Sequence, residues 1–353
     1  MRMVAADARA AVVPRLLAAG VLTPADVVDR GVVVADASRA NQVFLVHVGG
    51  PDGAGAAVKT LPAGAPDRLA AELRVHALAA DRPGLRAALP RLLADDRSEG
   101  WLALELIAPG ATLAAAHRDA LGYPLELAHA AGRALRAVHR ATDDLAPAGA
   151  AQLPWALWAL EPAGPAAFAW EEPALRAVLD GIAEPERYRA ALAAARLAWR
   201  PGCLMHGDLK WDNCLVARPA RDAAPELRII DWEAAGVGDP AWDLGGLVQE
   251  YLGYAALMVL DAGGARGSRA LYGAIDPVAD AVRALLGAYG AGGRLVERSM
   301  RFAGARLVQT SLEHASRDAA GARAAADTLL RLALLLLESP GAAMERLGLA
   351  EAV

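Results

Sequence analysis

The chain has 353 residues, which is too long for one ordinary hydrophobic core and predicts two packed units or one large two-lobed unit. Hydrophobic residues make up 55% and charged residues 22% of the sequence, a composition that excludes an intrinsically disordered chain. The formal net charge of -5 offers no basic face to a nucleic-acid backbone, so we expect no nucleic-acid partner.

The N-terminal stretch and the longest apolar run do not have the features of targeting or membrane segments. MRMVAADARAAVVPRLL carries scattered charges and lacks the apolar stretch and cleavage site of a secretory signal. The run from Leu329 to Leu337 contains Arg331 and is shorter than the roughly 20 residues that a membrane helix needs. Cys203 and Cys214 are expected to be reduced, buried thiols. We therefore expect a cytoplasmic protein that does not bind membranes.

Residues 31–60 alternate in the manner of β-structure. The stretches GVVVADA, VFLVHV and AAVKT are separated by the polar break SRANQ and the turn GGPDGAG, which predicts three strands and two turns. A helix is expected at about residues 66–80, and two further short strands at about residues 91–94 and 101–106. The first part of the chain is therefore predicted to be rich in β-structure.

Helix formers dominate after the break AlaProGly at residues 108–110. Extended signals return between residues 202 and 232, in CLM, CLVA and LRIIDW. After Pro240 the pattern is helical to the end, with breaks near residues 263–267 and 290–293. We expect a mainly helical second part that contains a small β-patch.

The string HGDLKWDN, residues 206–213, concentrates polar groups between two extended segments. Asp208 stands five residues before Asn213, so one loop can aim the carboxylate at an acceptor hydroxyl and the amide oxygen at a magnesium ion. Asp231 supplies a second, charged ligand from the neighbouring strand. Magnesium needs few protein oxygens besides phosphate and water, so these residues predict one metal-nucleotide site.

HGDLKWDN followed by IIDWEAAGVGDPAWDLGGL resembles the aminoglycoside phosphotransferase and choline kinase superfamily, a branch of the protein-kinase-like fold. The resemblance implies an α+β, two-lobed protein-kinase-like fold with a small antiparallel β-sheet plus helix in the N-terminal lobe and a mainly helical C-terminal lobe. It implies a nucleotide-binding lobe at residues 1–107 and a lobe with the catalytic loop and acceptor site at residues 108–353. The motifs lie within residues 204–247, and the order of elements over residues 31–350 also fits.

The resemblance also implies roles for single residues. Asp208 matches the catalytic base, Asn213 and Asp231 match the magnesium ligands, and Asp243 matches a residue that braces the catalytic loop. Asp243 also lies near the expected start of a helix, where it would act as a cap. His206 is expected to shape the loop, because Asp208 already occupies the position of the base.

A lysine on the third strand and a glutamate on the following helix are implied as well, and they are present as Lys59 and Glu72. Lys59 would be a compact cation for the α- and β-phosphates of ATP, and Glu72 would hold its long side chain in place. The alternative interpretations are a solvated lysine at the edge of a strand and an exposed helix charge.

Two further nucleotide contacts are expected in the first lobe. The turn at residues 35–42 has no glycine and resembles the Ser-x-x-Asn turn of small-molecule kinases, so Ser38 and the amides of residues 39–41 would cap the phosphates. The alternative is a simple hairpin turn. The segment LALELIAPG fits a hinge in which backbone groups of Glu105 and Ile107 bond the adenine edge.

Lys210 stands two residues after the expected base, where protein Ser/Thr kinases also place a lysine, and it would neutralise charge on the transferring γ-phosphoryl group. Glu233 is expected either to contact a second ion or to be a solvated or salt-bridged carboxylate. Trp211 and Trp232 are expected to pack rather than to bind substrate. Substrate identity is expected to reside in residues 154–200, a segment that includes Trp155, Trp158, Trp170, Glu171 and Glu172, and in the helices after Trp242.

These observations predict a phosphotransferase that moves the γ-phosphoryl of Mg-ATP to a hydroxyl of a small molecule or peptide. Two alternatives stay open. HGDLKWDNCLV is also similar to kinase components that phosphorylate Ser or Thr of ribosomally made peptides, of the lanthipeptide or thioamitide type, and work with a separate phosphate-eliminating lyase. The other alternative is a catalytically silent kinase-like scaffold, against which the joint presence of Lys59, Asp208, Asn213 and Asp231 argues.

Overall fold

The structure is a computed structural model of the chain. It describes residues 2–38, 41–50, 52–61, 66–108, 110–145, 153–158, 160–161, 182, 184–217, 223–261, 267–315 and 321–349. Several expectations fall outside these ranges, namely those for Arg39, Ala40, Trp170, Glu171, Glu172 and the break at residues 263–266.

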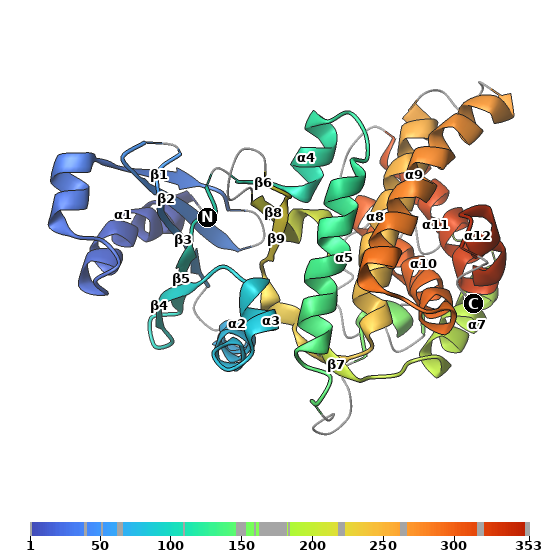
Figure 1. Cartoon of the computed structure of the whole chain (residues 1–353), viewed down its shortest axis with the longest axis horizontal. Coiled ribbons are helices and arrows are strands. Elements are labelled where there is room, and N and C mark those ends of the chain that lie inside the picture. The colour runs from blue at the N-terminus through green and yellow to red at the C-terminus, as the bar shows by residue number, and fades with distance from the viewer. Residues whose placement is uncertain are drawn as a thin grey trace. The chain divides into compact units, whose positions relative to one another are not determined.

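The chain divides into two compact units, each with its own contacts. The first unit is Met1–Ala116 with Asp212–Ala235, and the second is His117–Trp211 with Gly236–Val353. The predicted α+β fold is confirmed, because a small antiparallel sheet lies in the first unit and most helices lie in the second (Figure 1). The predicted lobe boundary after residue 107 stays a prediction.

A five-stranded antiparallel sheet in the order β1-β2-β3-β5-β4 forms the centre of the first unit. Its strands are β1 (Val32–Asp36), β2 (Gln42–Val48), β3 (Gly55–Thr60), β4 (Leu92–Asp96) and β5 (Trp101–Glu105). Alternate residues Phe44, Val46 and Val48 of β2 are buried, as the period-2 pattern predicts. They share a core with Val12 and Leu16 of α1 (Arg2–Ala18).

Helix α1 is not predicted from the sequence, since its Ala-rich stretch shows no clear apolar stripe and contains Pro14. The predicted helix after β3 is present as α2 (Pro66–Ala79), followed by the short α3 (Pro83–Ala87). Leu69 and Leu73 of α2 pack with Leu102 and Leu104 of β5 in a second cluster. This packing holds α2 against the sheet.

A three-stranded antiparallel sheet in the order β6-β8-β9 completes the first unit. Its strands are β6 (Gly110–Thr112), β8 (Cys214–Ala217) and β9 (Glu226–Ile229), and the turns η4 (Trp211–Asn213) and η5 (Trp232–Ala234) flank β8 and β9. Cys214 pairs with Ile229, so the residue before β8 and the residues after β9 lie at the same end of the strand pair.

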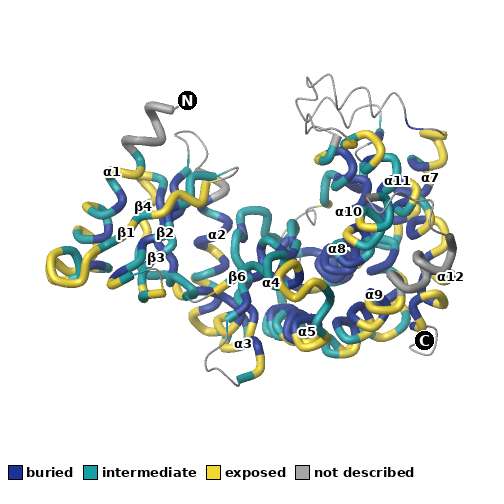
Figure 2. The backbone as a smooth tube through the Cα atoms, turned by 90° about the horizontal axis from the view of Figure 1, so that it is seen from above, coloured by how far each residue is buried: buried dark blue, intermediate teal, exposed yellow. Residues whose placement is uncertain are grey.

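The second unit is a helical bundle around α8, which Figure 2 shows largely in the colour of buried residues. Helix α4 (Leu113–Asp119) spans the division between the units. The described helices of the second unit are α5 (Leu125–Arg140), α7 (Pro185–Leu197), α8 (Pro240–Asp261), α9 (Gly267–Tyr289), α10 (Gly293–Ala315), α11 (Ala322–Glu338) and α12 (Pro340–Arg346), with the turn η2 (Trp155–Trp158). The predicted break at residues 290–293 separates α9 from α10.

Two glycines let α8 approach its neighbours closely. A Cβ at Gly245 would lie 2.8 Å from the backbone of Ser299 and Ala303 on α10. A Cβ at Gly246 would lie 2.5 Å from the carbonyl oxygen of Leu209. Strands β7 (Cys203–Met205) and β10 (Gly236–Gly238) pair antiparallel. The segment that contains Leu209 follows β7 in the chain.

No helix in the described part of the chain combines the length and the apolar character that crossing a membrane requires.

Candidate active site

Lys59 lies on β3 and is the centre of an ion cluster in the first unit. Its Nζ is 2.9 Å from Oε2 of Glu72 on α2 and 3.2 Å from Oε2 of Glu233, and it also contacts the carboxylate of Asp231. The side chains of Lys59 and Glu72 are 9% and 1% exposed. The ion pair that the sequence predicts between Lys59 and Glu72 is therefore present, and two more carboxylates join it.

The cluster contains three carboxylates for one cation. Burial would lower the pKa of Lys59, but the carboxylates of Glu72 and Asp231 outweigh burial and raise the pKa above its ordinary value. Burial, with smaller contributions from the charges of Asp231 and Glu233, raises the pKa of Glu72 above its ordinary value against the lowering effect of Lys59. The surplus of carboxylates favours a further cation at this place.

Asn213 and Asp231, the predicted magnesium ligands, both belong to the first unit. Asn213 ends η4 and is 6% exposed. Its main-chain carbonyl oxygen accepts a hydrogen bond from the main-chain amide of Ile230 at 3.0 Å. Asp231 follows with φ of 67°, a left-handed conformation that is unusual for a residue other than glycine and is concentrated at functional sites. The two residues therefore flank adjacent antiparallel strands, as predicted.

Glu233 is held from a second side. Its Oε2 accepts a hydrogen bond from Nδ2 of Asn41 at 2.8 Å, in addition to the contact with Lys59. The Ser-x-x-Asn turn thus contributes its asparagine to the ion cluster. The sequence motif pointed to this turn, but not to this contact.

The hydroxyl of Ser38 is part of the hairpin turn between β1 and β2. Its Oγ accepts from the amide of Val43 at 3.1 Å, and the amide of Ser38 donates to Asp36 Oδ1 at 2.9 Å. Hydrogen bonds from the Ser38 side chain and then from its amide lower the pKa of Asp36. The Ser38 hydroxyl therefore has a main-chain partner on β2, and its contact with the phosphates stays a prediction.

The expected hinge follows β5. The amide of Glu105 donates to the carbonyl of Arg91 at 2.8 Å, and the amide of Leu106 donates to the carbonyl of Gly55 at 3.2 Å. Ile107 is the next residue and lies beyond the strand. The chain therefore leaves the sheet at the position where the hinge is predicted.

Asp243 of α8 braces the catalytic loop in the second unit, which confirms that prediction. Its fully buried carboxylate accepts from the amides of His206 at 2.7 Å and Gly207 at 3.1 Å, and Nε2 of His139 lies 3.1 Å from Oδ2. The indole of Trp242 donates to the carbonyl of Gly207 at 2.9 Å. Gly207 has φ of 86°, which explains a glycine at this turn.

His206 shapes the loop, as expected. It is fully buried, and its Nδ1 accepts a hydrogen bond from the amide of Asp208 at 3.2 Å. Neighbouring Asp239 is also structural, because it accepts from the amide of Ala241 at 2.9 Å, in the first turn of α8, and pairs with Arg298 at 3.1 Å.

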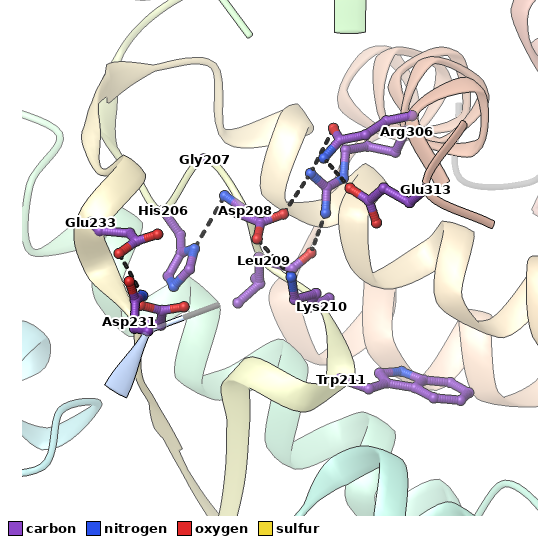
Figure 3. Close-up of polar contacts among 12 residues, drawn as sticks. His206, Gly207, Asp208, Leu209, Lys210, Trp211, Asp231, Glu233, Arg306 and Glu313 are labelled. Carbon is purple, nitrogen blue, oxygen red and sulfur yellow. Dashed lines mark hydrogen bonds and ion pairs between the residues drawn. The ribbon is translucent and has the colours of Figure 1, made fainter. Parts of the chain in front are cut away.

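The carboxylate of Asp208 lies between two cations (Figure 3). Oδ2 is 2.8 Å from Nζ of Lys210, and Oδ1 is 3.0 Å from a guanidinium nitrogen of Arg306 on α10. Burial would raise the pKa of Asp208, but Arg306 first and then Lys210 lower it to about 2. Asp208 in turn raises the pKa of Lys210, against the effect of burial.

Arg306 was not predicted from the sequence. It stands 98 residues after Asp208 and is 3% exposed among the buried residues Phe302, Ala303 and Leu307 of α10. A charged residue on the apolar face of a helix needs a partner, and this is the signal that the sequence carries.

The positions of the lysines are a second feature of the sequence that marks the two ion clusters. The sequence contains two lysines, Lys59 and Lys210, and arginine supplies every other basic side chain apart from histidine. Lys59 lies in the ion cluster of the first unit, and Lys210 lies in that of the second unit. Lysine is a compact, mobile point charge, whereas arginine is a rigid fork, so the two are not interchangeable at phosphate contacts.

The aromatic residues near the loop pack against each other. Trp211 is 4% exposed, and its ring centroid is 4.5 Å from that of His117 and 4.8 Å from that of Tyr251. Trp232 is 1% exposed and donates to the carbonyl of Ile229 at 2.9 Å. Both tryptophans therefore have the packing roles expected of them. Cys203 and Cys214 are buried thiols that are not joined in a disulfide, as expected.

Solved structures share this fold over most of the chain. A choline/ethanolamine kinase family protein from Mesorhizobium loti is 19% identical, with 98% of each chain covered and a TM-score of 0.54. The microcompartment-associated aminopropanol kinase is 16% identical, with 94% of this chain and 98% of that chain covered and a TM-score of 0.55. The choline kinase LicA from Streptococcus pneumoniae is 15% identical, with 87% and 94% covered and a TM-score of 0.53. LicA in complex with AMP is 14% identical, with 93% and 97% covered and a TM-score of 0.50.

At these identities the likeness concerns the fold alone. No curated protein matches the chain in sequence. The model of the phosphotransferase enzyme family, APH, matches residues 32–279, which is more than half of the chain and contains both ion clusters except for Arg306. The predicted enzyme class, a phosphotransferase, is confirmed by this match: the chain belongs to the phosphotransferase enzyme family.

Proposed function

We propose that the chain is an ATP- and magnesium-dependent O-phosphotransferase that moves the γ-phosphoryl group of ATP to a hydroxyl of a small molecule. The observation that carries the proposal is the buried pair of Lys59 and Glu72, with 2.9 Å between Nζ and Oε2. Kinases use such a pair to bind the α- and β-phosphates. A buried ion pair contributes little to stability compared with apolar packing, so its presence supports a binding role.

The residues present fit a magnesium ion. Asn213 offers an amide oxygen and Asp231 a carboxylate, which are the hard oxygen donors that magnesium prefers, and few protein ligands suffice when phosphates and water complete the shell. Within the described residues, no three His, Cys, Asp or Glu side chains form a metal cage by themselves. When bound, magnesium would neutralise charge on the β- and γ-phosphates.

Asp208 is the proposed acceptor of the hydroxyl proton. The acceptor oxygen forms a bond to the γ-phosphorus, the bond from phosphorus to the ADP oxygen breaks, and the hydroxyl proton passes to the Asp208 carboxylate. With a pKa of about 2, Asp208 is ionised at neutral pH and is a weak base. Its contribution is therefore mostly to orient the hydroxyl, with proton transfer late along the reaction.

The neighbours in fold support a nucleotide and a small alcohol. One of them is in complex with AMP, and two others are called choline kinase and aminopropanol kinase. Lysine-reactive acyl-phosphate analogues of ATP provide a direct test, because the chain has two lysines that mass spectrometry can distinguish. We expect Lys59 or Lys210 to be labelled, and excess Mg-ATP to protect it. Equal labelling with and without Mg-ATP would contradict the proposal.

A second candidate is phosphorylation of Ser or Thr in a ribosomally made peptide, with a separate lyase as partner. The observation that favours it is the contact of Lys210 with Asp208 at 2.8 Å, because protein Ser/Thr kinases place a lysine at the same spacing from the base. Incubation with ATP and a Ser/Thr-rich precursor peptide should then add the mass of one phosphate. An unchanged peptide mass alongside phosphorylation of a small alcohol excludes this candidate.

A scaffold without catalysis is tested in the same preparation. We expect Mg-ATP to raise the melting temperature more than ATP or magnesium alone, and ATP to be consumed slowly without an acceptor. The Lys59→Met variant should lose most of the ATP-dependent rise. Arg74→Gln is the matched control, because Arg74 is an exposed residue on the same helix as Glu72. A wild-type protein without stabilisation and without turnover would favour the scaffold.

A further inference from the structure

Arg306 holds the side chain and the backbone of the catalytic loop at the same time. One guanidinium nitrogen donates to Oδ1 of Asp208 at 3.0 Å, and the other terminal nitrogen donates to the carbonyl of Leu209 at 3.3 Å. Figure 3 shows the guanidinium directed at the loop from α10. A rigid fork of this kind fixes the carboxylate relative to its own main chain, which a single ammonium cannot do.

The guanidinium is itself held in place by its surroundings. The first nitrogen also donates to Oε1 of Gln309 at 3.1 Å, and Gln309 donates to Glu313 at 2.9 Å. The guanidinium carbon lies 5.7 Å from the ring centroid of Trp242, within cation–π range. Gly246 leaves room for this arrangement, since a Cβ there would meet the Leu209 carbonyl oxygen at 2.5 Å. Arg306 is therefore oriented before any ligand binds.

The two cations beside Asp208 differ in their freedom to move. Lys210 binds Oδ2 with a side chain that is 37% exposed, whereas Arg306 binds Oδ1 with a side chain that is 4% exposed. An exposed lysine can turn from the carboxylate to an incoming phosphoryl group, but the buried arginine stays where it is. If Lys210 leaves, the hydrogen bond from Arg306 still holds Oδ1 of Asp208.

We propose that Arg306 is the positioning residue of Asp208, which fixes the orientation of this carboxylate through the fork to Oδ1 and to the Leu209 carbonyl. The proposal rests on the proposed phosphotransferase function for its catalytic consequence, but not for its geometry. The charged or titratable groups that face Asp208 are Arg306, Lys210 and His206, and Glu313 also acts on Lys210. The charge of Arg306 lowers the pKa of Asp208 more than the charge of Lys210 does, and the hydrogen bond from Lys210 lowers it further.

The first experiment needs no enzymatic activity. With lysine labelled at the ε-carbon, the NMR spectrum of the chain contains two lysine resonances, and the Lys210→Arg variant assigns them. Because Lys210 contacts Asp208, its resonance should report the titration of that carboxylate. In wild type we expect no titration of this resonance between pH 7 and about pH 4. In Arg306→Gln we expect a midpoint that is about one to three pH units higher than in wild type.

The matched control is Arg301→Gln, on the same helix but bonded to the carbonyl of Leu337 at 3.2 Å. It should leave the Lys210 resonance as in wild type. If the midpoint in Arg306→Gln equals that in Arg301→Gln, the proposal is wrong. The Asp208→Asn variant must abolish the titration, which shows that the resonance reports Asp208 and no other group.

The second experiment separates the effect of Arg306 on the position of the Asp208 carboxylate from the effect of its charge. With Mg-ATP and water as acceptor, Arg306→Gln should lower kcat about 10-fold to 100-fold and leave the KM for ATP within about twofold. Arg306→Lys keeps the charge but loses the fork, so it should lower kcat while the pKa of Asp208 stays low. Full kcat in Arg306→Lys would overturn the proposal, and this variant also serves if Arg306→Gln does not fold. A wild-type protein that hydrolyses no ATP counts against the proposed function, whereas the NMR titration still decides the role of Arg306.

Discussion

The two units contain ion clusters of opposite stoichiometry. In the first unit one cation, Lys59, contacts three carboxylates, and in the second unit one carboxylate, Asp208, contacts two cations. In both clusters the charge that is in the minority is held firmly in its ionised form. The pKa of Lys59 is raised and the pKa of Asp208 is lowered, each against the effect of burial.

The sign of the surplus charge indicates which ligand each cluster can bind. A surplus of carboxylates attracts a metal cation, and a surplus of cations attracts an anionic phosphoryl group. A single ion pair has no surplus charge and would favour neither ligand. The proposed function uses both preferences, and four predictions test whether the comparison is sound.

Removal of the minority charge in the second unit should have the largest effect. Asp208→Asn leaves Lys210 and Arg306 without their shared carboxylate and removes the proposed proton acceptor. We expect kcat for phosphoryl transfer to fall about 100-fold to 10,000-fold, with the KM for ATP nearly unchanged. Steady-state kinetics of ADP release measure both values, with Glu226→Gln, a change at an exposed ion pair, as control. More than a tenth of the wild-type kcat would contradict the assigned role.

Removal of the minority charge in the first unit should mainly reduce stability. Lys59→Met leaves the buried Glu72 without its counter-ion, so the free energy of unfolding should fall by about 3 kcal/mol in urea denaturation. Lys59→Met combined with Glu72→Gln should recover much of the loss. Added magnesium should stabilise Lys59→Met more than wild type, because the carboxylates of Asp231 and Glu233 are then available to a cation. If the free energy of unfolding does not recover in the double variant, the unpaired Glu72 carboxylate is not the cause of the lost stability.

Acid should weaken the second cluster within a defined pH range. The pKa of Asp208 is lowered from 3.8 to about 2, so its contribution to stability is present above the unfolded value and is lost as the pH falls toward the folded value. This shift corresponds to about 2 kcal/mol. The difference in unfolding free energy between wild type and Asp208→Asn should be constant above pH 5 and shrink between pH 4 and pH 2. A difference that does not change with pH would show that Asp208 is unperturbed.

The smallest effect is expected at Ser38, which lies outside both clusters. Its hydroxyl is engaged by the amide of Val43 at 3.1 Å, so Ser38→Ala should cost about 1 kcal/mol or less of stability. The KM for ATP should change less than about twofold. Asn41→Ala is the informative companion, because Asn41 contacts Glu233 at 2.8 Å and its loss should perturb the first cluster. A tenfold rise in KM for Ser38→Ala would restore the phosphate-capping interpretation.

Much of the first unit could be predicted because its pattern is local. Strand alternation placed β1 to β3, and the family resemblance of the motifs at residues 204–247 implied the ion pair of Lys59 and Glu72 that is present. Helix α1 escaped prediction because alanine provides a weak apolar stripe. The strands β6 (GAT) and β10 (GVG) were not predicted because they are short and contain glycine, which is depleted in strands.

The sequence alone was enough to predict the chemistry proposed for the loop after β7, since Asp208, Lys210 and Asn213 lie within six residues of one another and Asp243 follows in the same motif block. Only the tertiary structure decided that Arg306 binds Asp208 and that Asn41 binds Glu233. The partners in these contacts are 98 and 192 residues apart. Periodicity describes which face of a helix is buried, but it does not tell which distant residue faces it. That depends on how closely helices such as α8 and α10 pack, and here the glycines at 245 and 246 set the distance.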